Sequence, residues 1–214
     1  MTLKVKNLSL YYKQKWVLRD FSLSCEKGKI TAVTGKSGIG KTTLLKCILG
    51  FTQPDSGDIF LDGEQLTSKT VWDFRRRIGY VQQEPVLGTG IVRDILRQPF
   101  LFEANRHLQW KNRQVEDLFA SFLLEPDLLT KRVPTLSGGE KQRIALISAL
   151  ILEREFYLFD EITSALDELT ERAVLHYIEG RKDVSILAVT HNKPFLSISD
   201  SVFHMENSEE RKNA

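Results

Sequence analysis

Residues 30–42, ITAVTGKSGIGKT, join a short apolar run to a glycine-rich segment that ends in lysine and threonine. The part from Gly35 to Thr42 fits the pattern G-x-x-x-x-G-K-[ST]. The next residues, TTLLKCILG, have helical character and end at Gly50. A strand, a glycine loop and a helix in this order cradle phosphates, because loop N–H groups and the helix dipole attract anions. The stretch therefore predicts a nucleoside triphosphate site.

Two residues of this loop have specific expected roles. Lys41 is expected to reach the β- and γ-phosphates, and the Thr42 hydroxyl is expected to ligate Mg²⁺. The residues predicted to surround the phosphates are Gly35, Lys36, Ser37, Gly38, Ile39, Gly40, Lys41, Thr42 and Thr43. The pattern indicates a nucleotide and magnesium but no particular reaction, since kinases, GTPases, motors and transport ATPases all use it.

A second candidate site is the stretch FYLFDE, residues 156–161, in which four apolar residues precede two acids. A buried strand holds its end rigidly, so Asp160 is predicted to lie beside the phosphate loop and to hold Mg²⁺ directly or through water. Glu161 comes next and points elsewhere, where a carboxylate can orient an attacking water and accept its proton. The pair predicts nucleotide hydrolysis.

The stretch LSGGEKQR, residues 136–143, precedes an apolar segment that reads as a helix. Ser137 and Glu140 match a capping box, but a capping box does not require Gly138 and Gly139. Two missing side chains clear the helix N-terminus for an anion, which predicts a second phosphate site. Because the chain has one phosphate loop, we expect Ser137 and the two glycines to serve a nucleotide that another copy holds.

The order of elements predicts the fold class α/β. Strand patterns alternate with helical patterns, which is typical of a mostly parallel sheet with helices on both faces. The first third of the chain is strand-rich and predicts an antiparallel β subdomain. Between residues 85 and 135, apolar residues recur at helical spacing with breaks at Pro99, Pro126 and Pro134. We therefore expect a core over 1–84 and 136–214 and an inserted helical lobe over 85–135.

Composition narrows the class of protein. The chain has 214 residues, 42% hydrophobic and 27% charged, with a net charge of +2, so nothing in it suggests a nucleic-acid surface. Cys25 and Cys47 do not form a disulfide framework and are expected to be small buried residues in a reducing compartment. No segment approaches the roughly 20 apolar residues that cross a bilayer. Work at a membrane would need another chain to supply the span.

Taken together, GKSGIGKT, LSGGE, FYLFDE, SALD (164–167) and a downstream TH resemble the ATP-binding cassette (ABC) ATPases. The resemblance covers nearly the whole chain, in the order and at the spacing of that family. It implies an ATP-dependent, head-to-tail dimer, with two ATP molecules sandwiched between the phosphate loop of one subunit and Ser137, Gly138 and Gly139 of the other.

The resemblance also implies roles for single residues. Tyr12 is expected to stack on adenine, although its neighbour Tyr11 stays open as the alternative. Gln83 is expected to meet Mg²⁺ and the attacking water, Asp167 to reach across the dimer, and His191 to contact the γ-phosphate. Two residues depart from the family pattern: Ile162 stands where proline is usual, and Glu140 replaces the commoner glutamine.

Within the family, one short cassette with a compact lobe resembles the ATP-hydrolysing subunit of a transporter. The implied partners are a transmembrane permease and a second cassette, which would place the chain on the cytoplasmic face of a membrane. The alternative is a regulatory ATPase that moves no solute. DEITSALDE together with the compact lobe is similar to ATPases of two-subunit iron exporters. A kinase or GTPase is disfavoured, because no N-K-x-D segment is present and LSGGE would have no role.

Overall fold

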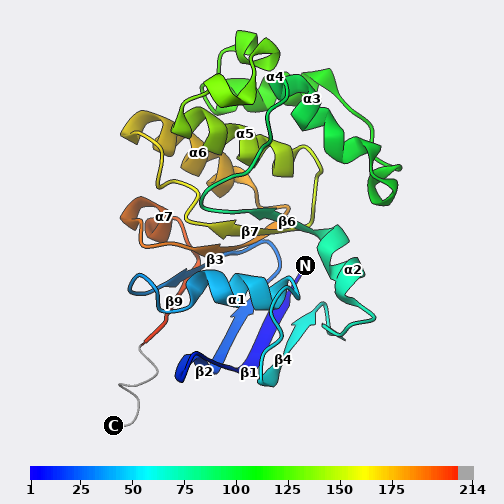
Figure 1. Ribbon diagram of the computed structural model, residues 1–214. Helices are drawn as coiled ribbons and strands as arrows, with labels where there is room; N and C mark the ends of the chain where they lie inside the picture. Colours follow the sequence, from blue (N-terminus) through cyan, green and yellow to red (C-terminus); the bar gives the residue numbers. More distant parts are fainter. Residues whose placement is uncertain (207–214) are drawn as a thin grey trace.

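The computed structural model describes residues 1–206, which form a parallel sheet, an antiparallel sheet and helices around them (Figure 1). The parallel sheet has the strand order β6-β7-β8-β3-β9. Its strands are β3 (Ile30–Thr34), β6 (Ile78–Val81), β7 (Phe156–Asp160), β8 (Ser185–Val189) and β9 (Ser201–His204). Neighbouring strands all run parallel, so their carboxyl ends meet at one edge.

The antiparallel sheet has the order β2-β1-β4-β5. Its strands are β1 (Leu3–Tyr12), β2 (Lys15–Cys25), β4 (Ser56–Leu61) and β5 (Glu64–Gln65). The turn between β4 and β5 is Asp62-Gly63, and both residues have positive φ (50° and 86°), as a tight hairpin turn requires. The Asp-Gly turn expected after GDIFL is therefore present.

Strand β7 shows why the parallel sheet needs cover on both faces. Phe156 and Leu158 join the apolar cluster on one face, while Tyr157 and Phe159 join the cluster on the other. Successive side chains of a strand point to opposite faces, so an unbroken apolar run is stable only between two layers. Burying each such side chain contributes roughly 2 kcal/mol relative to exposure.

Helices supply this cover. One face of the parallel sheet packs against α1 (Lys41–Ile48) and the antiparallel sheet, and the other lies under α5 (Gly138–Leu150) and α6 (Glu168–Gly180) (Figure 1). The short helices α2 (Val71–Arg77) and α7 (Lys193–Ser197) lie at the sides. The expected α/β core with an N-terminal antiparallel subdomain is confirmed.

The expected lobe contains α3 (Val92–Arg97) and α4 (Asn112–Ser121). Its 3₁₀ turns are η1 (Gln98–Leu101), η2 (Glu103–Asn105), η3 (Pro126–Thr130) and η4 (Val133–Thr135). The three prolines that interrupt the helical pattern each lie at the start of one of these turns, where a missing N–H is tolerated.

The lobe is helical, but it shares one apolar cluster with α5 and the adjacent face of the parallel sheet. Leu96 and Phe119 of the lobe are fully buried in this cluster. The division into a core and a lobe at residues 85 and 135 therefore stays a prediction. Among residues 1–206, no helix is both long and apolar enough to cross a bilayer.

Candidate active site

The glycine loop connects the end of β3 to the first residue of α1, as the sequence predicts. Gly40 is the N-cap of α1 and has φ +117°, which side chains disfavour. A Cβ at Gly40 would lie 2.8 Å from the carbonyl oxygen of Val17 in β2. Only glycine therefore fits between β2 and α1. The backbone N–H groups in the first turn of α1 have no capping side chain at Gly40 and suit an anion.

Lys41, the first residue of α1, turns back over this loop. Its Nζ donates to the carbonyl oxygens of Gly35 (2.8 Å) and Lys36 (3.2 Å). The same Nζ lies 3.7 Å from Oε1 of Glu161, and the Lys41 side chain is only 7% exposed. A buried cation over a glycine loop can attract phosphate oxygens strongly, because little water screens it.

Asp160 ends β7 beside α1 and is buried. Burial raises the pKa of its carboxyl group, and a hydrogen bond with the Thr42 side chain opposes this rise; the nearby Glu161 charge adds to it. A buried carboxylate next to a hydroxyl offers the oxygen ligands that Mg²⁺ prefers. Within residues 1–206, no cluster of three or more His, Cys, Asp or Glu side chains is arranged to hold a metal ion.

The Glu161 side chain contacts several of the predicted site residues. Its Oε2 lies 3.2 Å from Nδ1 of His191 and accepts a hydrogen bond from Nε2 of Gln83 (3.4 Å). Its backbone N–H donates to the carbonyl oxygen of Val189, which joins the ends of β7 and β8. The structure thus brings Lys41, Gln83, Glu161 and His191 together at the carboxyl edge of the parallel sheet.

The backbone of Glu161 is also unusual. Its φ is +47°, in the left-handed region that is uncommon for residues other than glycine. Such a conformation costs of order 1 kcal/mol and persists only where the surroundings enforce it. Here Ile162, the residue that stands in place of the usual proline, is buried and anchors the chain directly after Glu161.

Gly138 and Gly139 are the first two residues of helix α5. Ser137 is its N-cap: the Glu140 backbone N–H donates to Ser137 Oγ (3.2 Å), and the Ser137 N–H donates to Glu140 Oε2 (2.7 Å). The predicted capping box is therefore present. A Cβ at Gly138 would meet no atom within 4 Å, whereas one at Gly139 would lie 3.1 Å from the Ala165 carbonyl oxygen. No contact within residues 1–206 therefore requires a glycine at Gly138.

Asp167 is the N-cap of α6. Its Oδ1 accepts hydrogen bonds from the backbone N–H groups of Leu169 and Thr170, and its Oδ2 accepts one from the Thr170 hydroxyl. These bonds hold the pKa of Asp167 below its ordinary value. Within one chain this carboxylate caps its own helix. Its expected contact across a dimer stays a prediction.

The two candidate tyrosines lie at the end of β1, and both side chains are exposed. Leu10 pairs with Leu18, and both side chains are buried in the cluster beside α1. Tyr11 pairs with Trp16, and the two rings meet edge to face at 5.1 Å. Tyr12 pairs with Lys15, and the register of the two strands shifts between Leu10 and Tyr11.

A sequence comparison identifies the family to which this geometry belongs. The pattern of the ABC transporter family matches residues 18–164, which include the glycine loop, the α5 start and the end of β7. The chain belongs to the ABC transporter family. It is an ATP-hydrolysing cassette of that family, and the expectation of an ABC ATPase is confirmed.

Curated relatives include both exporters and importers. The chain is 33% identical over 212 residues to the probable iron export ATP-binding protein FetA of Escherichia coli, covering 95% of this chain and 91% of FetA. It is 34% identical over 218 residues to the energy-coupling factor transporter ATP-binding protein EcfA1 of Streptococcus pneumoniae, covering 96% of this chain and 77% of EcfA1. The expected similarity to an iron-export ATPase is thus confirmed.

Solved structures agree with the fold. An ATP-binding subunit of an ABC transporter superposes with a TM-score of 0.84 at 29% identity, over 97% of this chain and 87% of that one. A dimeric ATP-binding cassette bound to ADP and inorganic phosphate also has a TM-score of 0.84, over 96% and 94% of the two chains. At 22% identity the second structure supports the fold alone.

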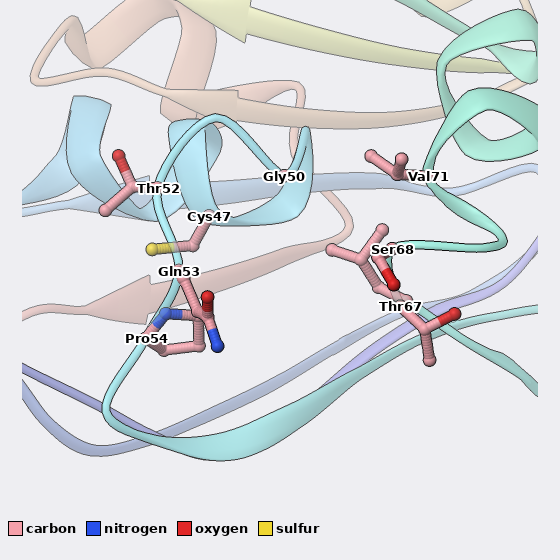
Figure 2. A pocket seen from close by; sticks show the side chains of 9 residues that line it. Cys47, Gly50, Thr52, Gln53, Pro54, Thr67, Ser68 and Val71 are labelled. Carbon is pink, nitrogen blue, oxygen red and sulfur yellow. The ribbon is translucent and has the colours of Figure 1, made fainter.

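Two cavities of this ABC cassette lie away from the glycine loop. One, of about 520 Å³, lies at the carboxyl end of α1 and is lined by Cys47, Gly50 and Thr67 among others, whose side chains are labelled in Figure 2. Another, of about 550 Å³, lies between the core and the lobe and is lined by Arg75 and Val86 among others. Neither is lined by the glycine loop, Glu161 or His191.

Sequence reasoning missed two residues next to the site. Asn192 directly follows His191 and donates through Nδ2 to Glu171 Oε1 in α6 (2.7 Å). Asn192 also caps α7, and asparagine followed by Pro194 is a helix-start signal that could have drawn attention to it. No local pattern indicated that Glu171 lies beside it, because a contact between separate elements is set by packing.

Proposed function

We propose that this ABC cassette binds Mg²⁺-ATP at the open edge of its parallel sheet, hydrolyses it in a head-to-tail dimer and drives a separate membrane subunit. The observation that carries the proposal is the convergence of Lys41, Glu161, Gln83 and His191 beside a glycine loop. In this arrangement residues 35–43 surround the phosphates, and Lys41 exchanges its contacts with loop carbonyls for contacts with phosphate oxygens.

Tyr12 is the residue proposed to stack on adenine. Val17 of β2 packs in the same apolar cluster as Leu10, and it is the residue against which Gly40 of the loop lies. The β1–β2 hairpin therefore lies beside the phosphate loop, and Tyr11 already packs edge to face against Trp16, which supports Tyr12 over Tyr11. The Tyr12 ring is exposed, and the Lys13 ammonium lies 5.4 Å from its centre. An exposed aromatic face near the loop is available for a base.

Mg²⁺ is proposed to be held by Thr42, Asp160 and Gln83 together with phosphate oxygens. The buried Asp160 carboxyl beside the Thr42 hydroxyl fits a hard cation, since an added positive charge stabilises the ionised form that burial disfavours. The ion would neutralise charge that develops on the phosphates. Gln83 is exposed and contacts Glu161, so its amide oxygen can turn toward an ion held by Asp160.

Glu161 is proposed to be the general base. It would orient a water toward the γ-phosphate and accept its proton. His191 and Gln83 both contact Glu161 Oε2, which supports a role for both beside the same water. Oε1 faces Lys41, so the carboxylate lies next to the group that would hold the phosphate.

The second half of the site is proposed to come from another copy of the chain. Ser137, Gly138 and Gly139 open the thirteen-residue helix α5, and a side chain at Gly138 would meet nothing in its own subunit. This open helix end suits the γ-phosphate of a nucleotide bound opposite. Asp167, at the nearby start of α6, would lie in the same interface.

The membrane partner is proposed to dock in the cavity between core and lobe. Phe51 and Val86 line this cavity and are 62% and 87% exposed, respectively, which is unusual for large apolar side chains. Arg75 stacks on Phe51 at 4.3 Å. The partner would place the chain on the cytoplasmic face of a membrane. The near-equal length match to FetA favours metal export over the other transport reactions of the relatives.

Nucleotide binding and phosphate release test this proposal. The purified chain should bind ATP and release phosphate only with Mg²⁺ present, and Lys41→Ala should lose both binding and turnover. Arg172→Ala, an exposed change on α6, is the matched control and should keep both. Turnover that survives Lys41→Ala or that ignores EDTA would overturn the assigned site. Reconstitution with a membrane subunit and labelled Fe²⁺ tests the cargo, and transport of other solutes alone would reject metal export.

A further inference from the structure

The loop that carries His191 is held by the residue that follows it. The Asn192 backbone N–H donates to Thr190 Oγ1 (3.0 Å), and Asn192 Oδ1 accepts from the Phe195 N–H (2.8 Å), which caps α7. The remaining group, Nδ2, donates to Glu171 Oε1 (2.7 Å). Asn192 thus links the His191 loop to Thr190, directly after β8, and to helices α7 and α6.

Glu171 belongs to the first turns of α6, directly after the Asp167 cap. Its backbone N–H donates to the Asp167 carbonyl oxygen (2.8 Å), and Thr170 beside it is buried and bonded to the Asp167 side chain. The start of α6 is therefore tightly bonded. The Glu171 carboxylate projects from a fixed point toward the Asn192 amide.

His191 itself has little to hold it. Its side chain is 69% exposed, and its Nδ1 lies 3.2 Å from Glu161 Oε2. An exposed imidazole keeps its place mainly through its backbone, since water competes for each polar contact. The Asn192–Glu171 hydrogen bond has a charged acceptor, which makes it stronger than a bond between neutral groups.

We propose that Asn192 is a positioning residue for hydrolysis: its bond to Glu171 fixes His191 relative to the Asp167 turn. The inference rests on the proposed function, because it assumes that His191 acts beside Glu161. In a dimer, a partner that docks against the Ser164–Asp167 turn would shift α6, and Glu171 would carry that shift to Asn192 and His191. Docking of the second copy and placement of the imidazole are thereby coupled.

We call the hydrogen bond between Asn192 and Glu171 the tether. Exchanging the amide of one residue with the carboxylate of the other tests the tether, because the exchange keeps the N-cap of α7. Asn192→Asp keeps an N-cap oxygen for Phe195, since aspartate is an equally good N-cap, but it sets one carboxylate against another. Glu171→Gln keeps an acceptor oxygen for Asn192. In Asn192→Asp/Glu171→Gln, the donor and acceptor are exchanged, so the bond is restored in the opposite direction. Glu168→Gln, in the same turn of α6, is the matched surface control.

Turnover and the KM for ATP are measured for the full chain and each variant, with a thermal melt to confirm folding. We expect Asn192→Asp to lower kcat about tenfold with KM within about twofold of wild type, and the double variant to recover most of kcat. Glu168→Gln should match wild type. A purely structural role of the bond predicts a lower melting temperature without a kcat loss that the exchange rescues.

The outcomes separate the tether from the proposed function. If wild type hydrolyses ATP and Lys41→Ala does not, but Asn192→Asp turns over at the wild-type rate, the tether is rejected and the active site stands. A double variant that is slower than Asn192→Asp also rejects it. If wild-type protein neither binds nor hydrolyses ATP, the proposed function fails, and the tether fails with it.

Discussion

Oε1 of Glu161 lies 3.7 Å from Nζ of Lys41, although Lys41 opens the first helix of the chain and Glu161 follows the strand β7. The contact joins the residue proposed to hold the phosphates to the residue proposed to activate water. The carboxylate partly neutralises the lysine, whose side chain is only 7% exposed. Binding of ATP would replace this carboxylate with phosphate and leave Glu161 free to face a water.

Glu161→Gln is the first test of this relationship. A glutamine keeps the shape of the side chain but cannot accept a proton, so we expect turnover to fall at least about a hundredfold. ATP should still bind and should hold two chains together, which size-exclusion chromatography with ATP would detect. Glu155→Gln is the control, because Glu155 directly precedes the first residue of β7, at the other end of the strand from Glu161. Monomers alone in the presence of ATP would contradict either the role of Glu161 or the sandwich.

Gly138→Asp tests whether the start of α5 meets a second chain. A Cβ at this position meets nothing within 4 Å in its own subunit, so the variant should fold and bind ATP. A carboxylate would repel the opposite γ-phosphate, and we expect the ATP-dependent dimer of a Glu161→Gln background to disappear. Gly180→Asp, also in open space on a helix, should leave the dimer intact. A Gly138→Asp protein that still dimerises would place the interface elsewhere.

Arg143 predicts a stability effect that is separate from nucleotide. Its guanidinium is nearly buried and donates to the carbonyl oxygens of Phe122 (2.8 Å) and Leu123 (2.9 Å), which ties α5 to the end of α4. Arg143→Leu would leave both carbonyl oxygens without this hydrogen-bond donor, and we expect the free energy of unfolding to fall by about 2–3 kcal/mol. Urea denaturation measures this. Arg172→Ala changes an exposed side chain and should lower the free energy of unfolding far less. Equal losses in the two variants would show that the contacts of Arg143 with the end of α4 do not stabilise the fold.

Cys47 predicts a loss of stability in alkali. Burial raises the pKa of its thiol from 9.0 to about 11. A group whose pKa is higher in the folded state stabilises it fully below pH 9 and loses that contribution as the pH rises toward 11, at about 1.4 kcal/mol per pH unit. Urea midpoints at pH 8 to 10.5 should fall less steeply for Cys47→Ala. Ile48→Val, which shortens a buried neighbour without a titratable group, should keep the wild-type slope.

Much of this site was predictable because its residues occur in local patterns. The glycine loop must follow a strand and open a helix, so ITAVTGKSGIGKT fixed both the fold of β3 and α1 and the position of Lys41. The capping box of Ser137 and Glu140 is equally local, since both partners lie within one helical turn. The unbroken apolar run of β7 predicted a buried strand, and its side chains are buried on two faces.

Other features depend on contacts between distant segments. The sequence left Tyr11 and Tyr12 as alternatives, and the contact of Tyr11 with Trp16 across the β1–β2 hairpin could not be seen in the local pattern of either residue. The Asn192–Glu171 bond arises only where α6 packs beside the end of β8. The chain alone thus determined which chemistry is possible, through spacing within single elements. Tertiary structure decided which side chains meet, because that depends on how separate elements pack.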